Sequence, residues 1–218
     1  REMPALTKEI YKLGIPSIIM YFLMTFYIVF LNMILGGFSD AAVTVLGLYY
    51  RLQSFFFIPL FAMHACIVPI LSFNYARREY GRCRQMMRNI TIVSLAFMTI
   101  GTACFLLIPR CLLNIFTPTE EVLRVGIPAF RIIGISFFPA VFSMTLPIFF
   151  QAVGQLAPSI WLSLTRHVFC LMTLFYLLSL IGLGWTWASF PLAESITGGV
   201  GIILYYHHWR TLKLRAIS

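Results

Sequence analysis

Five long stretches of this 218-residue chain contain no Asp, Glu, Lys or Arg. They cover residues 13–39, 52–76, 89–109, 132–165 and 167–193, and the shortest contains 21 residues. A helix needs roughly 20 apolar residues to cross a hydrocarbon core about 30 Å thick. Inside that core the backbone must satisfy its own hydrogen bonds, so uninterrupted apolar runs form helices. The sequence therefore predicts an all-α membrane protein with several spans.

Composition supports this fold class and excludes others. Apolar residues make up 60% of the chain and charged residues 11%, against roughly 25% charged residues in soluble domains. The runs are longer than the apolar core of a signal peptide, about 7–15 residues. They also lack the alternation over about ten residues that is typical of an outer-membrane barrel. The net charge of +9 comes from basic residues at the ends of the runs, which indicates contact with membrane lipid rather than nucleic acid.

We expect six transmembrane spans, at about 10–34, 46–73, 90–109, 125–150, 158–181 and 185–206. An even number of spans places both termini on one side of the membrane. The same side would receive Lys8 and Lys12, five arginines within residues 77–88, and the basic residues after position 209. Because Lys and Arg accumulate in cytoplasmic loops, both termini are predicted to be cytoplasmic.

Three segments resemble multidrug and toxic compound extrusion (MATE) transporters, nearest their DinF-like branch. They are "GLYYRLQSFFFIPLFAMHACIVPILSFNYARREYGRCRQ" at 47–85, "FFQAVGQLAPSIWLSLTRH" at 149–167 and "GLGWTWASFPLAESI" at 182–196. The segments occur in the family's order. Within them, six residues match motif positions to which the resemblance gives a structural role: Pro59, Pro69, Asn74, Gly154, Arg166 and Pro191. His167 departs from the family pattern, which has Gln there.

The resemblance implies a fold and a function. Such transporters have twelve helices in two lobes, and this chain is similar only to the C-terminal six-helix lobe, so we expect a fragment whose N-terminal lobe is missing. The implied function is secondary active export of organic cations or drugs by antiport with protons or sodium. The implied location is the plasma (inner) membrane of a prokaryote. Two alternatives remain: a flippase for a lipid-linked substrate, and a non-transporting half-protein that dimerises.

Polar groups within the spans are candidate functional residues, because burying them in lipid is costly. The cavity candidates are Tyr21, Thr25, Gln53, Phe56, His64, Ser136, Ser143 and Gln151. The charged ones are Arg51, Arg131 and Glu194. The arginines are interpreted as anchors that snorkel or pair with Asp40, Glu120 or Glu121, although they could contact an anionic group or the other lobe.

Glu194, in the last span, is predicted to make a structural bond rather than to couple ions. His64 is predicted to hydrogen-bond between helices. Pro59 and Pro69 should interrupt the second span, Pro128, Pro139 and Pro147 should punctuate the fourth, and each proline should bend its helix. We expect no metal site, because the five cysteines lack CxxC spacing. No cofactor or enzymatic activity is predicted, because hydrolase and phosphate-binding motifs are absent from the sequence.

Overall fold

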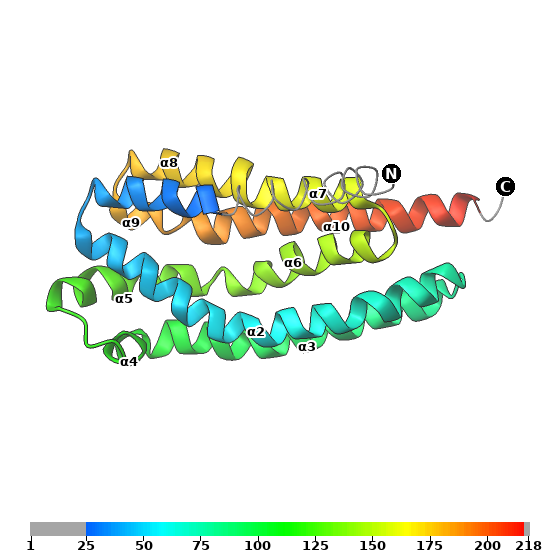
Figure 1. The fold of residues 1–218 in the computed structure, drawn as a ribbon, viewed down its shortest axis with the longest axis horizontal. Helices are drawn as coiled ribbons and strands as arrows, with labels where there is room; N and C mark the ends of the chain where they lie inside the picture. The colour runs from blue at the N-terminus through cyan, green and yellow to red at the C-terminus, as the bar shows by residue number, and fades with distance from the viewer. Residues whose placement is uncertain (1–24, 216–218) are drawn as a thin grey trace, which may run out of the picture.

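The protein is described by a computed structural model over residues 25–215, and most of these residues lie in helices (Figure 1). A helix over Thr25–Gly36 comes first. The following elements are α2 (Asp40–Ala76), α3 (Tyr80–Leu107), α4 (Pro109–Asn114), α5 (Glu120–Gly134), α6 (Phe137–Ala152), α7 (Leu156–Leu164), the π-helix η1 (Thr165–Met172), α8 (Thr173–Ser179), α9 (Leu183–Thr186) and α10 (Ser189–Arg215).

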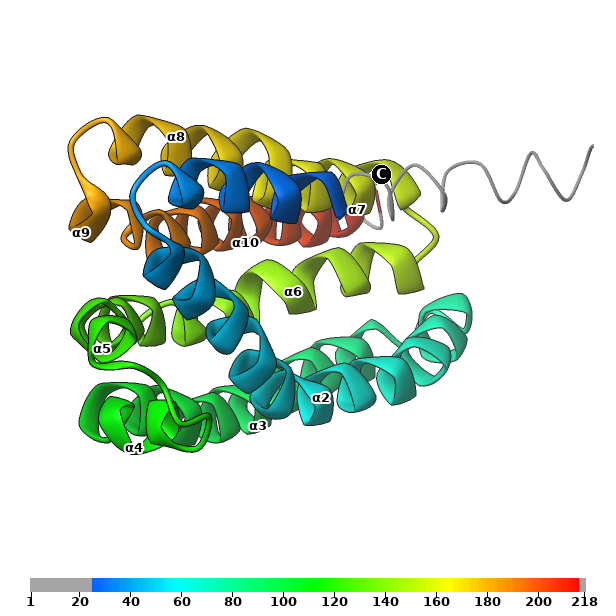
Figure 2. The ribbon, with the colours of Figure 1, turned by 60° about the vertical axis from the view of Figure 1, so that its left-hand side comes forward.

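The second helix begins at a side-chain cap and continues without a break. The Ser39 hydroxyl accepts a hydrogen bond from the Ala42 amide at 3.2 Å, which satisfies a donor that has no partner within the helix. Pro59 and Pro69 both lie inside α2. The prediction that they interrupt this helix is therefore wrong, because the helix continues across each proline, although Figures 1 and 2 show that α2 is bent along its length. A tight turn with Arg78 at φ +59° then leads into α3.

A real break separates α5 from α6, at residues 135–136, where the two helices are bent by 52°. Pro128 lies inside α5 and Pro147 inside α6, so neither marks the break. Pro139 lies in the first turn of α6, where a proline removes no hydrogen bond because those amides have no partner within the helix. The predicted bend of this span exists, but it lies between Pro128 and Pro139 rather than at a proline.

The next span changes its helical type without ending. α7 is followed directly by η1 and then by α8. A π-helix has a wider turn than an α-helix and is found mostly as short insertions within one. Two glycines with positive φ shape the connections on either side of this span: Gly154 at +77° before α7 and Gly182 at +149° before α9. Gly154 thus has the structural role expected of it, since a side chain there would be strained.

α6 occupies the centre of the bundle. It packs against α10 on one side and against α2 and α3 on the other, and Figures 1 and 2 both show it between these layers. Its buried rings Phe137 and Phe149 belong to two separate apolar clusters. Phe137 lies in the larger one, with Phe56 and Phe105, and Phe149 lies in a smaller one with Trp209 near the C-terminal end of α10. Both faces of α6 are therefore covered.

Within residues 25–215, four helices are long and apolar enough to cross a membrane: Asp40–Ala76, Tyr80–Leu107, Leu156–Ser179 and Leu183–Leu212. The bent pair α5–α6 makes a fifth if it forms one span. Residues 10–24 of the predicted first span, including Tyr21, lie outside the described residues. The chain is an all-α membrane protein, and the exact membrane boundaries of its six expected spans stay predictions.

Candidate functional site

The only acid of the predicted spans forms an ion pair inside the helix bundle. Glu194 on α10 accepts two hydrogen bonds from Arg166 Nε, at 2.9 Å to Oε1 and 3.0 Å to Oε2. Arg166 Nη2 donates a third to Oε1 at 2.6 Å. The two side chains are 15% and 12% exposed, so the bundle shields both charges. A planar guanidinium matches a carboxylate in this two-point geometry, which fixes the position of both residues.

A third helix joins this pair through a hydroxyl group. Ser143 on α6, itself buried, donates a hydrogen bond to Glu194 Oε2. Both carboxylate oxygens of Glu194 therefore have partners, one on η1 and one on α6. We call Ser143, Arg166 and Glu194 the polar centre, because it connects the three elements α6, η1 and α10. The prediction that Glu194 makes a structural bond is consistent with this geometry.

Aromatic side chains lie around the polar centre. The Tyr27 ring, on the first described helix, is 5.1 Å from the His167 ring, next to Arg166. His167 in turn makes a 3.1 Å hydrogen bond to the Ser163 carbonyl. Tyr49 on α2 is buried and contacts Phe190 on α10, with ring centroids 5.2 Å apart. Aromatic rings from several helices thus lie close to the ion pair.

His64 forms the inter-helix hydrogen bond that the sequence predicts. Its Nε2 lies 3.0 Å from Thr145 Oγ1, which joins α2 to α6. The His64 side chain is 2% exposed. A bond between two buried side chains on facing helices stabilises their packing in the membrane. His64 therefore serves helix packing in this structure.

Most of the other cavity candidates that lie within residues 25–215 are away from the polar centre. Phe56 packs between Phe105 and Phe137 in the apolar core, and Ser136 is buried just before α6. Gln53 is half-buried on α2, while Thr25 and Gln151 are exposed near helix ends. Burial makes Phe56 and Ser136 packing residues in this structure. The exposed and half-buried candidates stay predictions for substrate contact.

The two intramembrane arginines make none of the ion pairs suggested for them. Arg51 and Arg131 are both exposed, and among residues 25–215 neither lies within 4 Å of a carboxylate oxygen. Two of the motif positions have clear structural roles. Asn74 donates to the Ile70 carbonyl at 2.7 Å, and Pro191 lies in the first turn of α10.

Five arginines, which we call the arginine cluster, meet at the α2–α3 turn and along the first turns of α3. They are Arg77, Arg78, Arg82, Arg84 and Arg88. Glu79 accepts from Arg82 at 2.9 Å and lies 3.7 Å from Arg77. The Arg84 guanidinium lies 4.6 Å from the centre of the Trp209 ring, a cation–π contact that attaches α10 to this hairpin. The cluster thus helps to pack one end of the bundle as well as marking it with charge.

Sequence reasoning missed the partner of Glu194 and placed Arg166 near the cytoplasmic charges. The sequence nevertheless contains a feature that indicates the pair. Arg166 and Glu194 carry opposite charges, lie at the two ends of the neutral run 167–193, and have no other charged residue nearby in sequence. Their 28-residue separation is compatible with two antiparallel helices that bring both into one layer. Thr145, the partner of His64, gave no such signal, because threonine is common in membrane helices.

Comparisons with known proteins agree with this architecture. The chain is 25% identical over 206 residues to the multidrug export protein MepA of Staphylococcus aureus (strain bovine RF122 / ET3-1), an alignment that covers 91% of this chain and 44% of the relative. The chain therefore spans less than half the length of the curated relatives it matches.

Two solved structures of a multidrug resistance MATE family transporter of the MOP superfamily have the same fold. The inward-facing conformation matches with a TM-score of 0.88 at 19% identity and covers 96% of this chain and 49% of that chain. The outward-facing conformation matches with a TM-score of 0.85 at 18% identity, with 96% and 48% covered. The family model MatE matches residues 16–177. Because that match covers most of the sequence, the chain belongs to the MATE family of transporters.

Proposed function

We propose that this chain is the C-terminal six-helix lobe of a secondary active transporter that exports organic cations or drugs in exchange for protons or sodium. The observation that carries the proposal is the half-length match. The chain aligns over 91% of its own length with 44% of a multidrug export protein. Its fold also covers about half of each solved transporter, 49% and 48%. We further propose that it belongs to the DinF-like branch and that both termini are cytoplasmic.

The similarity to two conformations supports a moving lobe. TM-scores of 0.88 and 0.85 to the inward-facing and outward-facing structures are nearly equal. Alternating access in many transporters is largely rigid-body rocking of one half against the other. A lobe whose own fold fits both states is suited to such a motion, and the polar centre supports its rigidity by connecting three elements.

The geometry of the polar centre favours ion coupling elsewhere. A coupling carboxylate must exchange its partner for a proton or a sodium ion during transport. Both oxygens of Glu194 are already bonded, to Arg166 and Ser143, so an ion would have to displace one of them. We propose that the coupling acid lies in the N-terminal lobe and that Glu194 holds this lobe together.

Substrate contact is proposed for the neutral candidates that the bundle does not bury. Thr25, Gln53 and Gln151 are exposed or half-buried, and Tyr21 is retained with them as a candidate from the sequence. Organic cations suit such a surface, because amide and hydroxyl oxygens accept hydrogen bonds and aromatic faces attract cations.

The test is transport by a full-length protein in which an N-terminal lobe precedes this chain. Proteoliposomes loaded with a fluorescent organic cation should release it under an imposed proton or sodium gradient. Glu194→Gln should keep that gradient-driven efflux. The 218-residue chain alone should show none, and efflux by the chain alone would contradict the proposal in favour of a self-sufficient half-protein. Movement of a lipid-linked sugar instead of the cation would favour the flippase.

A further inference from the structure

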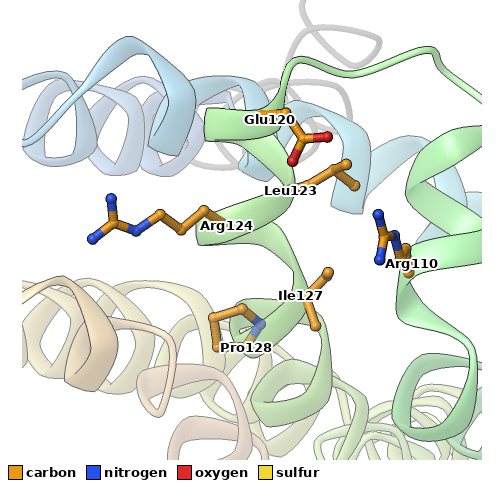
Figure 3. A pocket seen from close by; sticks show the side chains of 6 residues that line it. All are labelled: Arg110, Glu120, Leu123, Arg124, Ile127 and Pro128. Atoms are coloured by element: carbon orange, nitrogen blue, oxygen red, sulfur yellow. The ribbon is translucent and has the colours of Figure 1, made fainter.

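A second group of charges lies at the end of the bundle opposite the arginine cluster. Arg110 on α4 and Glu120 and Arg124 on α5 line a pocket of about 310 Å³, together with Leu123, Ile127 and Pro128. Figure 3 shows Glu120 on α5 and Arg110 on α4 facing each other, while the Arg124 side chain extends away from them on the other side of α5. All three charged residues are exposed. The pocket therefore combines both signs of charge at its rim with an apolar wall.

These charges do not neutralise one another by direct pairing. Over the described range 25–215, the ion pairs within 4 Å involve Glu79 and Glu194 as acids, and none involves Glu120. The two guanidinium groups and the carboxylate thus keep hydrogen-bonding capacity for a ligand. Arginine presents several N–H donors in a fixed planar array that fits phosphate oxygens, and a carboxylate accepts bonds from an ammonium group.

The surroundings of the pocket are apolar, as at a membrane surface. Leu107, Ile108 and Ile115, which flank the short α4, are all exposed. Large exposed apolar side chains in a membrane protein contact acyl chains, and charged residues at the ends of spans lie at the depth of the lipid headgroups. A ligand of this pocket would therefore meet the charged rim with a polar head while its apolar tail follows α4.

We infer that this pocket binds the headgroup of a zwitterionic phospholipid, phosphatidylethanolamine. Its phosphate would accept hydrogen bonds from Arg110, and its ammonium would donate to Glu120, which faces Arg110 across the pocket. The apolar wall of Leu123, Ile127 and Pro128 would contact the first acyl carbons. In the proposed orientation this lipid lies in the outer leaflet. The inference depends on the pocket alone and is independent of the transport function.

Glu120 decides which lipid is preferred. An anionic lipid such as phosphatidylglycerol would satisfy Arg110 but would leave Glu120 facing an anion without an ammonium partner. Like charges in proximity are unfavourable, so the carboxylate should select against that lipid. Replacing Glu120 with Gln removes the selection while the arginines remain.

The experiment uses the 218-residue chain in detergent with equal amounts of phosphatidylethanolamine and phosphatidylglycerol of matched acyl chains, and counts retained lipids by native mass spectrometry. The wild type should retain more phosphatidylethanolamine. Glu120→Gln should lower the ratio of the two lipids by about twofold to fivefold, the effect expected from losing one solvent-exposed charge interaction. Arg110→Gln should reduce retention of both lipids.

Two controls match these variants. Glu121→Gln changes the neighbouring exposed acid, which does not line the pocket, and should leave the ratio unchanged. Arg88→Gln removes an exposed arginine at the opposite end of the bundle and should leave retention as in the wild type. Equal retention of the two lipids by the wild type would overturn the inference. So would a ratio that Glu120→Gln leaves unaltered or that Glu121→Gln changes equally.

Discussion

Arg166 on η1 and Glu194 on α10 are 28 residues apart in sequence, yet Arg166 Nη2 lies 2.6 Å from Glu194 Oε1. Breaking a buried pair by removing one partner costs more than the pair contributes, because a charge is left buried without compensation. Glu194→Gln should therefore lower the free energy of unfolding of the purified chain by about 3 kcal/mol. Thermal denaturation in detergent measures this loss.

The matched control is Glu79→Gln, which removes the acid paired with Arg82 at 2.9 Å in a largely exposed position. An exposed pair contributes about 0.2–1 kcal/mol, so this change should lower stability much less. Replacing both Arg166 and Glu194 with Gln should recover part of the loss, since no uncompensated charge remains. Equal destabilisation by Glu194→Gln and Glu79→Gln would show that the polar centre is not shielded from water.

The bond between His64 and Thr145 should make a small and specific contribution. Thr145→Val keeps the shape of the side chain but removes the hydroxyl that lies 3.0 Å from His64 Nε2. Inter-helix hydrogen bonds in membranes contribute about 0.6 kcal/mol on average, so the melting temperature should fall slightly. Thr145→Ser retains the hydroxyl and should have a smaller effect. If Thr145→Val and Thr145→Ser have the same melting temperature, the hydrogen bond itself contributes nothing to stability.

Close packing of α10 against α6 predicts opposite results at two neighbouring glycines. A Cβ atom at Gly201 would lie 2.9 Å from Leu146 Cδ1 and 3.2 Å from Leu146 Cβ, whereas at Gly199 nothing lies within 4 Å. Gly201→Ala should destabilise the protein by about 1–3 kcal/mol through overpacking. Gly199→Ala should be neutral or stabilising by up to about 1 kcal/mol, because alanine favours the helix. Melting temperatures of the two variants distinguish the outcomes. A loss of stability in Gly199→Ala would contradict this arrangement of α10 against α6.

The proposed orientation can be tested with an impermeant thiol reagent. Cys83, within the arginine cluster, is fully buried and lies 3.9 Å from the Leu71 carbonyl, so it is a poor probe. Gln85→Cys puts a thiol at an exposed position of the same end, while the natural Cys111 is exposed at the other end. In intact cells the reagent should label Cys111, and the Gln85→Cys thiol should react only after the membrane is permeabilised. The reverse pattern would invert the topology.

The sequence predicted the fold class and family correctly because both depend on features visible in one dimension. Long neutral runs must form helices in lipid, because the backbone there has to satisfy its own hydrogen bonds. The family resemblance is carried by the motif segments 47–85, 149–167 and 182–196. The hydrogen bond of His64 was also foreseeable, because a buried imidazole needs a partner. Its partner Thr145 was not, since that depends on how α2 and α6 face each other.

Predictions that depended on local geometry were less successful. Proline favours a helix break, yet α2 continues through Pro59 and Pro69. Conversely, α5 ends at Gly134 without a proline at the break. Backbone accommodation of a proline depends on neighbouring turns and helices, which the sequence does not display. The pairing of Arg166 with Glu194 likewise depends on how η1 packs against α10, which the sequence does not display.

The unbroken length of α2 has a consequence for bilayer mechanics. Its 37 residues follow a helix axis about 56 Å long, which Figures 1 and 2 show to be bent, whereas a bilayer with its headgroups is about 40–45 Å thick. The bend and a tilt together would reconcile the two lengths, and both displace one end of the helix sideways relative to the other. Hydrophobic mismatch then acts on this helix, because a thinner bilayer increases its tilt and moves the α2–α3 turn laterally beneath the headgroups. The thickness of the membrane therefore influences the shape of the lobe.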